Sequence, residues 1–202
     1  MNKKLLLIPL LLCALLLATG CEEETTPTKP EIVYDELTPM ATNRLTVFQA
    51  ESKKNGQLTY SNPDSFKTAS DPFVWIGCEW YHDSGNDSIY WRNGVDGLWR
   101  LSFMNGGAAW TVEKLYAYPA KPGDKWIVPS DNDTMRLVSY TETVTVDAGT
   151  FNNCYRYRAE RNDRKRVTTV WFKPGIGKVQ GESWEIIGSD TLTSTMKLKY
   201  YE

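Results

Sequence analysis

The sequence has 202 residues, 41% of them hydrophobic, and a formal net charge of −2 at pH 7. A chain of this length can bury one sizeable core, and its mildly acidic balance lacks the excess of cations that nucleic-acid binding requires. One histidine and four cysteines are too few for a zinc-protease pair, and their spacing fits no structural zinc site. We therefore expect no metal, no cofactor and no nucleic-acid partner.

The N-terminus has the pattern of a secretory signal. Residues 5–18 form an apolar run behind the positive charges of Lys3 and Lys4. A transmembrane helix needs roughly 20 apolar residues, so this shorter run is typical of a signal peptide that is removed after export. Residues 1–20 are the predicted signal peptide.

A cysteine stands at the predicted cleavage site. The segment Leu17-Ala18-Thr19-Gly20-Cys21 resembles the lipobox of bacterial lipoproteins. The resemblance implies that Cys21 carries acyl chains such as palmitate, and several chains together give a stable membrane anchor. We expect attachment to the outer membrane of a bacterial cell envelope, on either its periplasmic or its outer face.

The next segment, residues 21–40, is predicted to be a tether. It is rich in proline, threonine and glutamate and has little to bury, as a semi-extended spacer would. The acidic run Glu22-Glu23-Glu24 resembles signals that send some lipoproteins to the cell surface, although a solvated start to a linker explains it equally well. Residues 41–202 then form a single β-domain.

The first half of this domain alternates aromatic and β-branched runs with turn residues. The pattern predicts strands at residues 45–50, 57–60, 73–82, 88–92, 98–104 and 108–116. The run 73–82 is apolar on both faces, which predicts one central strand with Trp75 and Trp80 on opposite sides.

The second half continues in the same style after a loop at residues 119–124. Strands are predicted at residues 125–128, 134–146, 151–160, 167–173, 178–187 and 191–201. We therefore predict an all-β fold, an antiparallel meander of about eleven strands that curls into a barrel or half-barrel, because curling shortens exposed edges.

Two segments of the second half carry a family resemblance. Val144-Thr-Val-Asp-Ala-Gly-Thr-Phe-Asn-Asn-Cys154, followed by Trp171-Phe-Lys-Pro-Gly-Ile-Gly-Lys-Val179, resembles a module of uncharacterised bacterial lipoproteins and periplasmic proteins. Their pattern is V-x-V-x-A-G-T-F-x-x-C and then P-G-[IV]-G-x-V, and the chain differs from it at Asp147 and at Lys178, where leucine is common. The resemblance covers residues 116–202 and implies a half-barrel similar to the lipoprotein-carrier fold, without implying an activity.

Residues that could perform catalysis are few. His82, Asp83 and Ser84 are adjacent on the chain, where neighbouring side chains point apart and cannot relay a proton. Four acidic residues could still converge in space as a glycosidase pair, which would require a defined separation. They are Glu79, Asp83, Asp87 and Glu185.

The domain keeps two cysteines, Cys78 and Cys154. An exported protein permits a disulfide between them, whereas the absence of a dense cysteine pattern fits two buried free thiols. Both alternatives remain open at this point.

A cluster of cations surrounds a predicted hairpin tip, and it suggests an anion-binding patch for lipid phosphates or an acidic glycan. Its members are Arg156, Arg158, Arg161, Arg164, Lys165 and Arg166. Charged strands that discourage edge pairing are the other interpretation.

The aromatic residues of the first half are the main candidates for ligand binding. They are Trp75, Trp80, Tyr90, Trp91 and Trp99. Tyr90 and Trp91 are consecutive on one strand and cannot both face the core, so an accessible aromatic face could stack on sugar rings or accept an acyl chain. Alternatively, a second layer, such as residues 32–34, covers that face.

These observations favour a lipid-anchored, non-catalytic envelope protein that binds a hydrophobic or glycan ligand or a partner protein. The alternatives are an anchored glycan-active hydrolase and a structural surface subunit.

Overall fold

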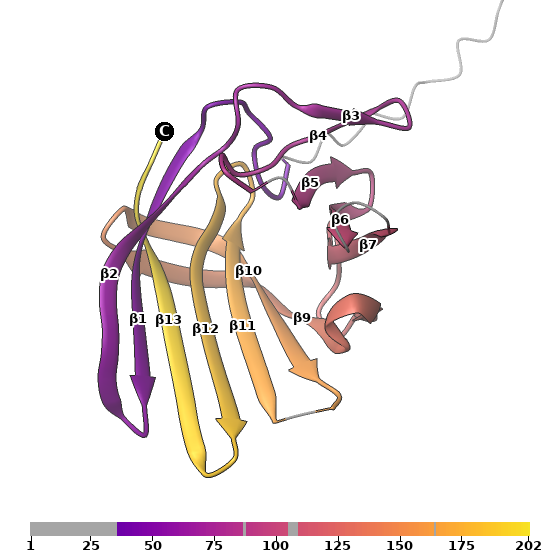
Figure 1. Ribbon diagram of the computed structural model, residues 1–202. Helices are drawn as coiled ribbons and strands as arrows, with labels where there is room; N and C mark the ends of the chain where they lie inside the picture. Colours follow the sequence, from indigo (N-terminus) through magenta and orange to yellow (C-terminus); the bar gives the residue numbers. More distant parts are fainter. Residues whose placement is uncertain (1–35, 87, 105–108, 164) are drawn as a thin grey trace, which may run out of the picture. The chain divides into compact units, whose positions relative to one another are not determined.

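The computed structural model describes residues 36–86, 88–104, 109–163 and 165–202 (Figure 1). The predicted signal peptide, Cys21 and the tether as far as residue 35 lie outside these ranges, as do Asp87 and Arg164. No helix within the described ranges is long and apolar enough to cross a bilayer.

The described chain folds into antiparallel strands joined mostly by short turns. The elements are β1 (Leu45–Lys54), β2 (Gln57–Lys67), β3 (Phe73–Trp75), β4 (Cys78–Trp80), β5 (Ile89–Gly94), β6 (Gly97–Met104), β7 (Ala109–Ala117), β8 (Lys125–Val128), the 3-10 helix η2 (Pro129–Asp131), β9 (Asp133–Val146), β10 (Gly149–Arg161), β11 (Arg166–Lys173), β12 (Gly177–Ile187) and β13 (Asp190–Tyr201). The predicted all-β class is confirmed.

Eight strands form one large sheet in the order β2-β1-β13-β12-β11-β10-β9-β8 (Figure 1). From β8 to β13 the strands follow chain order, as the predicted meander does. The first strand then pairs with the last, because β1 lies antiparallel to β13. The sheet remains open, with β2 and β8 as its two edges. Pro63 lies in edge strand β2, the kind of strand in which proline is tolerated.

The long strands β9 and β10 bend the large sheet. They have 14 and 13 residues, and their pairing shifts register near Phe151, Cys154 and Arg156. Such irregularities kink a ladder locally. The far end of the hairpin reaches β13, where the backbone N–H of Ala148 donates to the carbonyl oxygen of Leu198 at 3.2 Å. A hydrophobic cluster fills this curl, and its buried members are Phe48, Val144, Phe151, Cys154, Val179 and Leu198.

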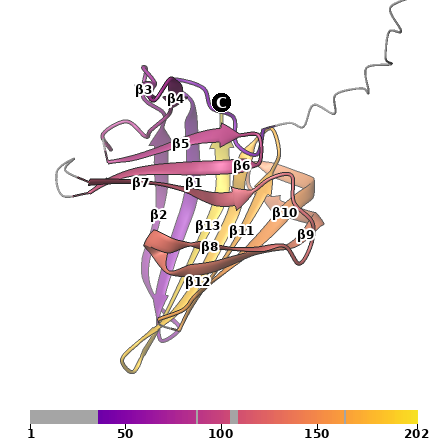
Figure 2. The ribbon, with the colours of Figure 1, turned by 90° about the vertical axis from the view of Figure 1, so that its right-hand side faces the viewer.

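The prediction of a single meander is wrong for the middle of the chain. Strands β5, β6 and β7 form a separate three-stranded sheet, and β3 pairs only with β4. Figure 2 shows β5, β6 and β7 running across the strands of the large sheet. Leu98 and Leu115 of this small sheet pack with Tyr157, Val170 and Phe172 of the large one in the main hydrophobic cluster.

The predicted central strand 73–82 is instead a tight hairpin. Ile76 and Gly77 have φ angles of 49° and 70°, so these two residues form a reverse turn between β3 and β4. Because Phe73 pairs with Trp80 and Trp75 with Cys78, all four side chains lie on one face. Trp75 and Trp80 are in edge contact, with ring centroids 6.2 Å apart, and the expectation that they face opposite sides is wrong.

The disulfide alternative is also corrected. Cys78 and Cys154 are both free thiols in the structure. Cys154 is fully buried in the cluster of the β9–β10 curl, whereas Cys78 borders the cluster between the β3–β4 hairpin and the small sheet. Their strands belong to different sheets, so the fold gives the two side chains no common environment.

Candidate functional site

A cavity of about 540 Å³ lies between the small sheet and the large sheet. The register of the small sheet explains one wall, since Trp91 and Arg100 are paired neighbours that share a face and both line the cavity. Glu113 pairs with Arg100 on the same face. The large sheet contributes Thr46, Phe48, Thr168, Phe172 and Lys178, among others. The volume falls within the range of about 300 to 1,000 Å³ that is usual for small-molecule sites.

Apolar and polar residues share the lining of the cavity. The apolar part includes Met40, Leu98, Leu115, Met135, Phe172 and Ile176, together with the ring of Tyr116. Burial raises the pKa of Tyr116 to about 12, so its hydroxyl stays neutral at physiological pH. The cavity therefore combines apolar surface with seven charged side chains, those of Arg44, Asp83, Arg100, Asp131, Asp133, Arg166 and Lys178.

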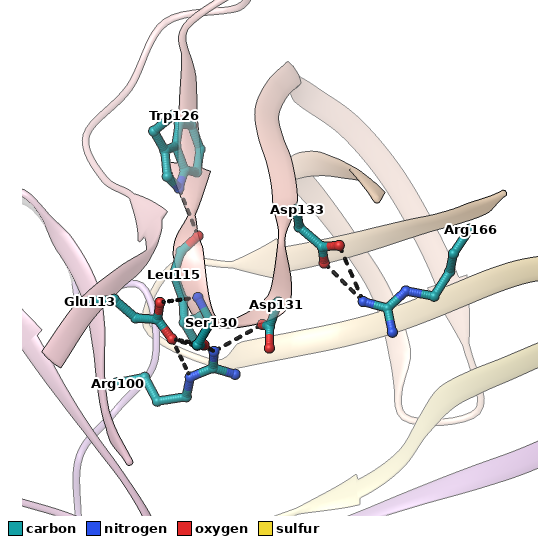
Figure 3. Close-up of polar contacts among 8 residues, drawn as sticks. All are labelled: Arg100, Glu113, Leu115, Trp126, Ser130, Asp131, Asp133 and Arg166. Atoms are coloured by element: carbon teal, nitrogen blue, oxygen red, sulfur yellow. Dashed lines mark hydrogen bonds and ion pairs between the residues drawn. The ribbon is translucent and has the colours of Figure 1, made fainter. Parts of the chain in front are cut away.

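One end of the cavity carries a paired charge network, shown in Figure 3. Arg100 donates from Nε to Glu113 Oε1 at 3.0 Å, and its Nη2 donates to the same oxygen, to Ser130 Oγ at 2.6 Å and to Asp131 Oδ2 at 2.9 Å. The backbone N–H of Ser130 donates to Glu113 Oε2 at 3.2 Å. Helix η2, which contains Ser130 and Asp131, thereby ties the network to the start of β9.

Burial would raise the pKa of Glu113, but hydrogen bonds from Ser130 and Arg100 outweigh it and hold this pKa below its ordinary value. Burial would lower the pKa of Arg100, but the carboxylates of Glu113 and Asp131 outweigh this effect, and the pKa of Arg100 is raised. Both partners are therefore held in their charged forms.

Two further contacts complete this end (Figure 3). Arg166 Nη2 donates to both carboxylate oxygens of Asp133, at 3.0 and 3.3 Å, and Asp133 is buried. The indole N–H of Trp126 in β8 donates to the carbonyl oxygen of Leu115 in β7 at 2.9 Å. The first contact links β11 to β9 within the large sheet, and the second joins the small sheet to edge strand β8. Each arginine at this end is thus bound to a carboxylate.

The other end of the cavity is arranged differently around Lys178 of β12. Its Nζ lies 4.9 Å from the ring centroid of Phe48 and 6.0 Å from that of Phe66, and 3.9 Å from Met196 Sδ. None of the described residues places a carboxylate oxygen within 4.0 Å of this nitrogen. Lys178 is half-buried, and it is one of the residues that line the cavity.

Asp83 and Arg44 are the charged neighbours of Lys178. Burial lowers the pKa of Lys178, and the charge of Asp83 offsets part of that effect. Burial raises the pKa of Asp83, which Lys178 and His82 partly oppose. Arg44 donates through Nη2 to the carbonyl oxygen of Ile176, two residues before Lys178, and burial lowers its pKa.

The five predicted aromatic ligand residues do not form one accessible face. Trp91 lines the main cavity. Trp75, Trp80 and Trp99 line a separate cavity of about 220 Å³ on the other side of the small sheet, and Tyr90 is buried beside them. The strand alternation that separates Tyr90 from Trp91 was predicted correctly, but the layer that covers Tyr90 is the β3–β4 hairpin.

The predicted cationic patch is largely balanced by nearby acids. Arg156 pairs with Glu142 at 3.3 Å, Arg158 with Glu160 at 2.9 Å and Arg161 with Asp163 at 2.8 Å. Arg166 is bound to Asp133, Lys165 is exposed, and Arg164 lies outside the described ranges. Four of the six cations thus have a carboxylate partner, which fits the interpretation of charged strands better than that of an anion site.

The acidic residues considered for hydrolysis are dispersed. Of the three that the structure describes, only Asp83 lines the main cavity. Glu79 is exposed and accepts a hydrogen bond from the hydroxyl of Tyr81 at 3.1 Å, and Glu185 lies in β12 opposite Arg166. Within the described ranges, no group of three or more histidine, cysteine or acidic residues is placed to hold a metal ion.

The residue that sequence reasoning missed is Lys178. It was noted only as a difference from the resembled module. A usable signal was present, because the lysine falls in the strand segment Gly177–Val179 between buried residues. Its position inside a cavity depends on segments that are distant in the sequence, among them β1, β2 and residues 81–83, and no local pattern reveals that packing.

Comparisons with known proteins add two structural likenesses. No family model matches the chain, and no curated protein matches it. A Bacteroides fragilis protein, provisionally described as exported and as having a YmcC-like fold, is similar with a TM-score of 0.43 and 15% identity over 84% of this chain and 100% of that chain. A provisionally described lipoprotein of Parabacteroides distasonis has a TM-score of 0.44 and 13% identity, again over 84% of this chain and 100% of that chain. At these values neither likeness carries an inference about function.

Proposed function

We propose that this protein is a lipid-anchored, non-catalytic binding protein of the bacterial cell envelope, and that it holds a small, largely apolar ligand between its two sheets. The observation that carries the proposal is the cavity of about 540 Å³, whose lining combines apolar surface with convergent charged groups. That combination is typical of small-molecule binding sites.

The location rests on the N-terminal sequence. Two lysines, a short apolar run and the lipobox-like segment ending at Cys21 support export and acylation. An outer-membrane anchor through Cys21, with palmitate among its acyl chains, would place the cavity within reach of envelope lipids.

The hydrolase alternative gains no support from the cavity. Glycoside hydrolysis needs two carboxyl groups flanking the substrate, about 5 to 9.5 Å apart. Asp131 and Asp133 line the cavity but are held by Arg100 and Arg166, and Asp83 stands near the opposite end. A binding role requires none of these groups to react.

The experiment fills the cavity with a larger side chain placed on strand β11 of the large sheet. Thr168 of β11 lines the cavity, so Thr168→Phe should fill the space, whereas Thr169→Phe places the same ring on the opposite face of the same strand. Equilibrium dialysis of radiolabelled dodecan-1-ol would compare the mature lipoprotein and both variants in lipid nanodiscs. Empty nanodiscs correct for partitioning into the lipid.

We expect saturable binding to the wild type and to Thr169→Phe, and at least a roughly tenfold loss in Thr168→Phe. Far-ultraviolet circular dichroism and thermal melting check that both variants are folded. Equal binding to the wild type and a folded Thr168→Phe would disprove the cavity as the binding site.

A further inference from the structure

We infer that the ligand is an amphiphile with an acidic head group, and that Lys178 binds this group inside the cavity. The inference rests on the proposed function, because it names the ligand class of the same site. Its basis is the difference between Lys178 and the other cations of the lining.

Lys178 is placed as a receptor for an anion. Its ammonium group has three donors to satisfy, and its recorded neighbours are the rings of Phe48 and Phe66 and the thioether of Met196. Rings and a thioether are weak partners for a cation that has been removed from bulk water. A carboxylate or phosphate oxygen at hydrogen-bond distance would satisfy the group far better.

The other charges at this end do not remove the need for a partner. Arg44 adds a second cation, and its guanidinium is directed to the carbonyl oxygen of Ile176. Asp83 supplies one carboxylate, but no oxygen of it lies within 4.0 Å of Lys178 Nζ. His82 and Tyr81 also line this region and carry no fixed negative charge at neutral pH. Two cations therefore face one acid.

Arg100 and Arg166 show what satisfied cations look like in the same cavity. Each is in direct contact with a carboxylate, at 2.9 and 3.0 Å for Asp131 and Asp133. Their positions are explained by holding the small sheet, β9 and β11 together. Lys178 has no such structural partner, and Phe48, Phe66 and Phe172 beside it offer an apolar surface for the body of an amphiphile.

The test compares ligands that share a chain and differ in head group. Dodecanoate, dodecyl phosphate and dodecan-1-ol are dialysed against the nanodisc-held lipoprotein, and the Thr168→Phe variant gives the background. Lys178→Met keeps the length of the side chain and removes its charge, Lys178→Arg keeps the charge, and Lys197→Met removes an exposed lysine from the neighbouring strand β13.

We expect Lys178→Met to weaken binding of at least one acid by about 10- to 100-fold, as the loss of a charge-assisted hydrogen bond would. Binding of dodecan-1-ol should change less than about twofold, Lys178→Arg should retain most of the acid affinity, and Lys197→Met should behave as wild type. The acid that depends on Lys178 then shows whether the head group is a carboxylate or a phosphate.

The measurements distinguish a failure of the inferred acidic head group from a failure of the proposed function. If the wild type binds acid and alcohol alike and Lys178→Met changes neither, the acidic head group is disproved while the proposed function stands. The same conclusion follows if Lys178→Met weakens acid and alcohol equally, because the lysine then only shapes the cavity. If no ligand binds the wild type above the Thr168→Phe background, the proposed function itself fails.

Discussion

The two ends of the cavity use cations in opposite ways. At one end Arg100 contacts Glu113, Ser130 and Asp131, and Arg166 contacts Asp133 (Figure 3). At the other end the ammonium of Lys178 contacts two phenyl rings and a thioether, and its acidic neighbour Asp83 has no oxygen within 4.0 Å of it. The first arrangement joins elements of the fold, whereas the second leaves a cation in the cavity lining without a carboxylate in direct contact.

The difference has a physical consequence for stability. A buried ion pair costs desolvation that its own contacts offset, so removing one partner leaves an uncompensated charge. A buried cation without a carboxylate in contact carries the desolvation cost without an offsetting contact, so its removal should raise the free energy of unfolding. Removing a charge at the paired end should therefore destabilise the protein, whereas removing the charge of Lys178 should stabilise it.

The largest effect is expected at the paired end. Glu113→Ala leaves Arg100 with Ser130 Oγ and the half-exposed carboxylate of Asp131, and it removes the acceptor of the Ser130 backbone N–H. We expect the free energy of unfolding to fall by about 3 kcal/mol, measured by urea denaturation of the lipoprotein. Asp190→Asn, which breaks the exposed pair with Lys54, is the control and should have no measurable effect. A Glu113→Ala protein as stable as the control would show that this network does not hold the sheets together.

The next largest effect is expected in the pH dependence of stability, which should differ in sign between Glu113 at the paired end and Asp83 near Lys178. The pKa of Glu113 is held below its ordinary value of 4.5, so the unfolded state binds more protons between the unfolded and folded pKa values. The stability that Glu113 contributes is thus present above pH 4.5 and is lost as the pH falls through the folded pKa. Asp83 has the opposite sign, because burial raises its pKa and stability falls as the pH rises from 3.8 through the raised value.

The measurement is a series of urea midpoints from neutral pH to about pH 3 for the wild type, Glu113→Gln and Asp83→Asn. The difference between wild type and Glu113→Gln should shrink as the pH falls below about 4.5, while Asp83→Asn should gain stability relative to wild type as the pH rises. Parallel curves for all three proteins would contradict the assigned pKa directions.

A smaller gain in stability is expected from Lys178→Met. The substitution removes a desolvated charge and keeps an apolar chain of similar length beside Phe48 and Phe66. The lost attraction to Asp83 offsets part of the gain, so we expect about 1 kcal/mol, or a melting temperature about 2 to 4 °C higher. Arg100→Met should lower the melting temperature instead, because it leaves the buried carboxylate of Glu113 without its cationic partner. A lower melting temperature for Lys178→Met would place Lys178 among the structural cations.

Local turn chemistry explains why much of the fold was predictable from the sequence. The reversals at Gly56 and Gly175 have φ angles of 81° and 79°, and the strands on either side pair with their chain neighbours. Turns at Asn-Gly and Pro-Gly positions mark such hairpins reliably. Where β1 pairs with β13, or where β5 to β7 leave the large sheet, the contacts join distant segments and no short pattern records them.

The Ile76-Gly77 turn and the candidate site show where sequence reasoning stops. A β-branched residue at a positive φ is rare, so the apolar run around Ile76 was interpreted as one strand, and Trp75 and Trp80 were assigned to the wrong faces. Of the five aromatic candidates only Trp91 lines the main cavity. A lysine on a strand is usually solvated, and only the packing of distant segments around it, such as β1 and β2, makes Lys178 an internal group.

The smallest expected effect concerns Asp83, the acid that faces Lys178 across the cavity end. If Lys178 binds an acidic head group, the carboxylate of Asp83 repels that group, and Asp83→Asn removes the repulsion without changing the shape of the side chain. We expect dodecanoate to bind Asp83→Asn about threefold more tightly at neutral pH, and dodecan-1-ol to bind it as it binds the wild type, by the same dialysis measurement. Asp83 also offsets part of the burial effect on the pKa of Lys178, so its removal lowers that pKa further. Weaker binding of dodecanoate to Asp83→Asn would therefore show that Asp83 keeps Lys178 charged. The two residues would then be a coupled pair, and Lys178 would not be a cation whose main role is to bind the ligand.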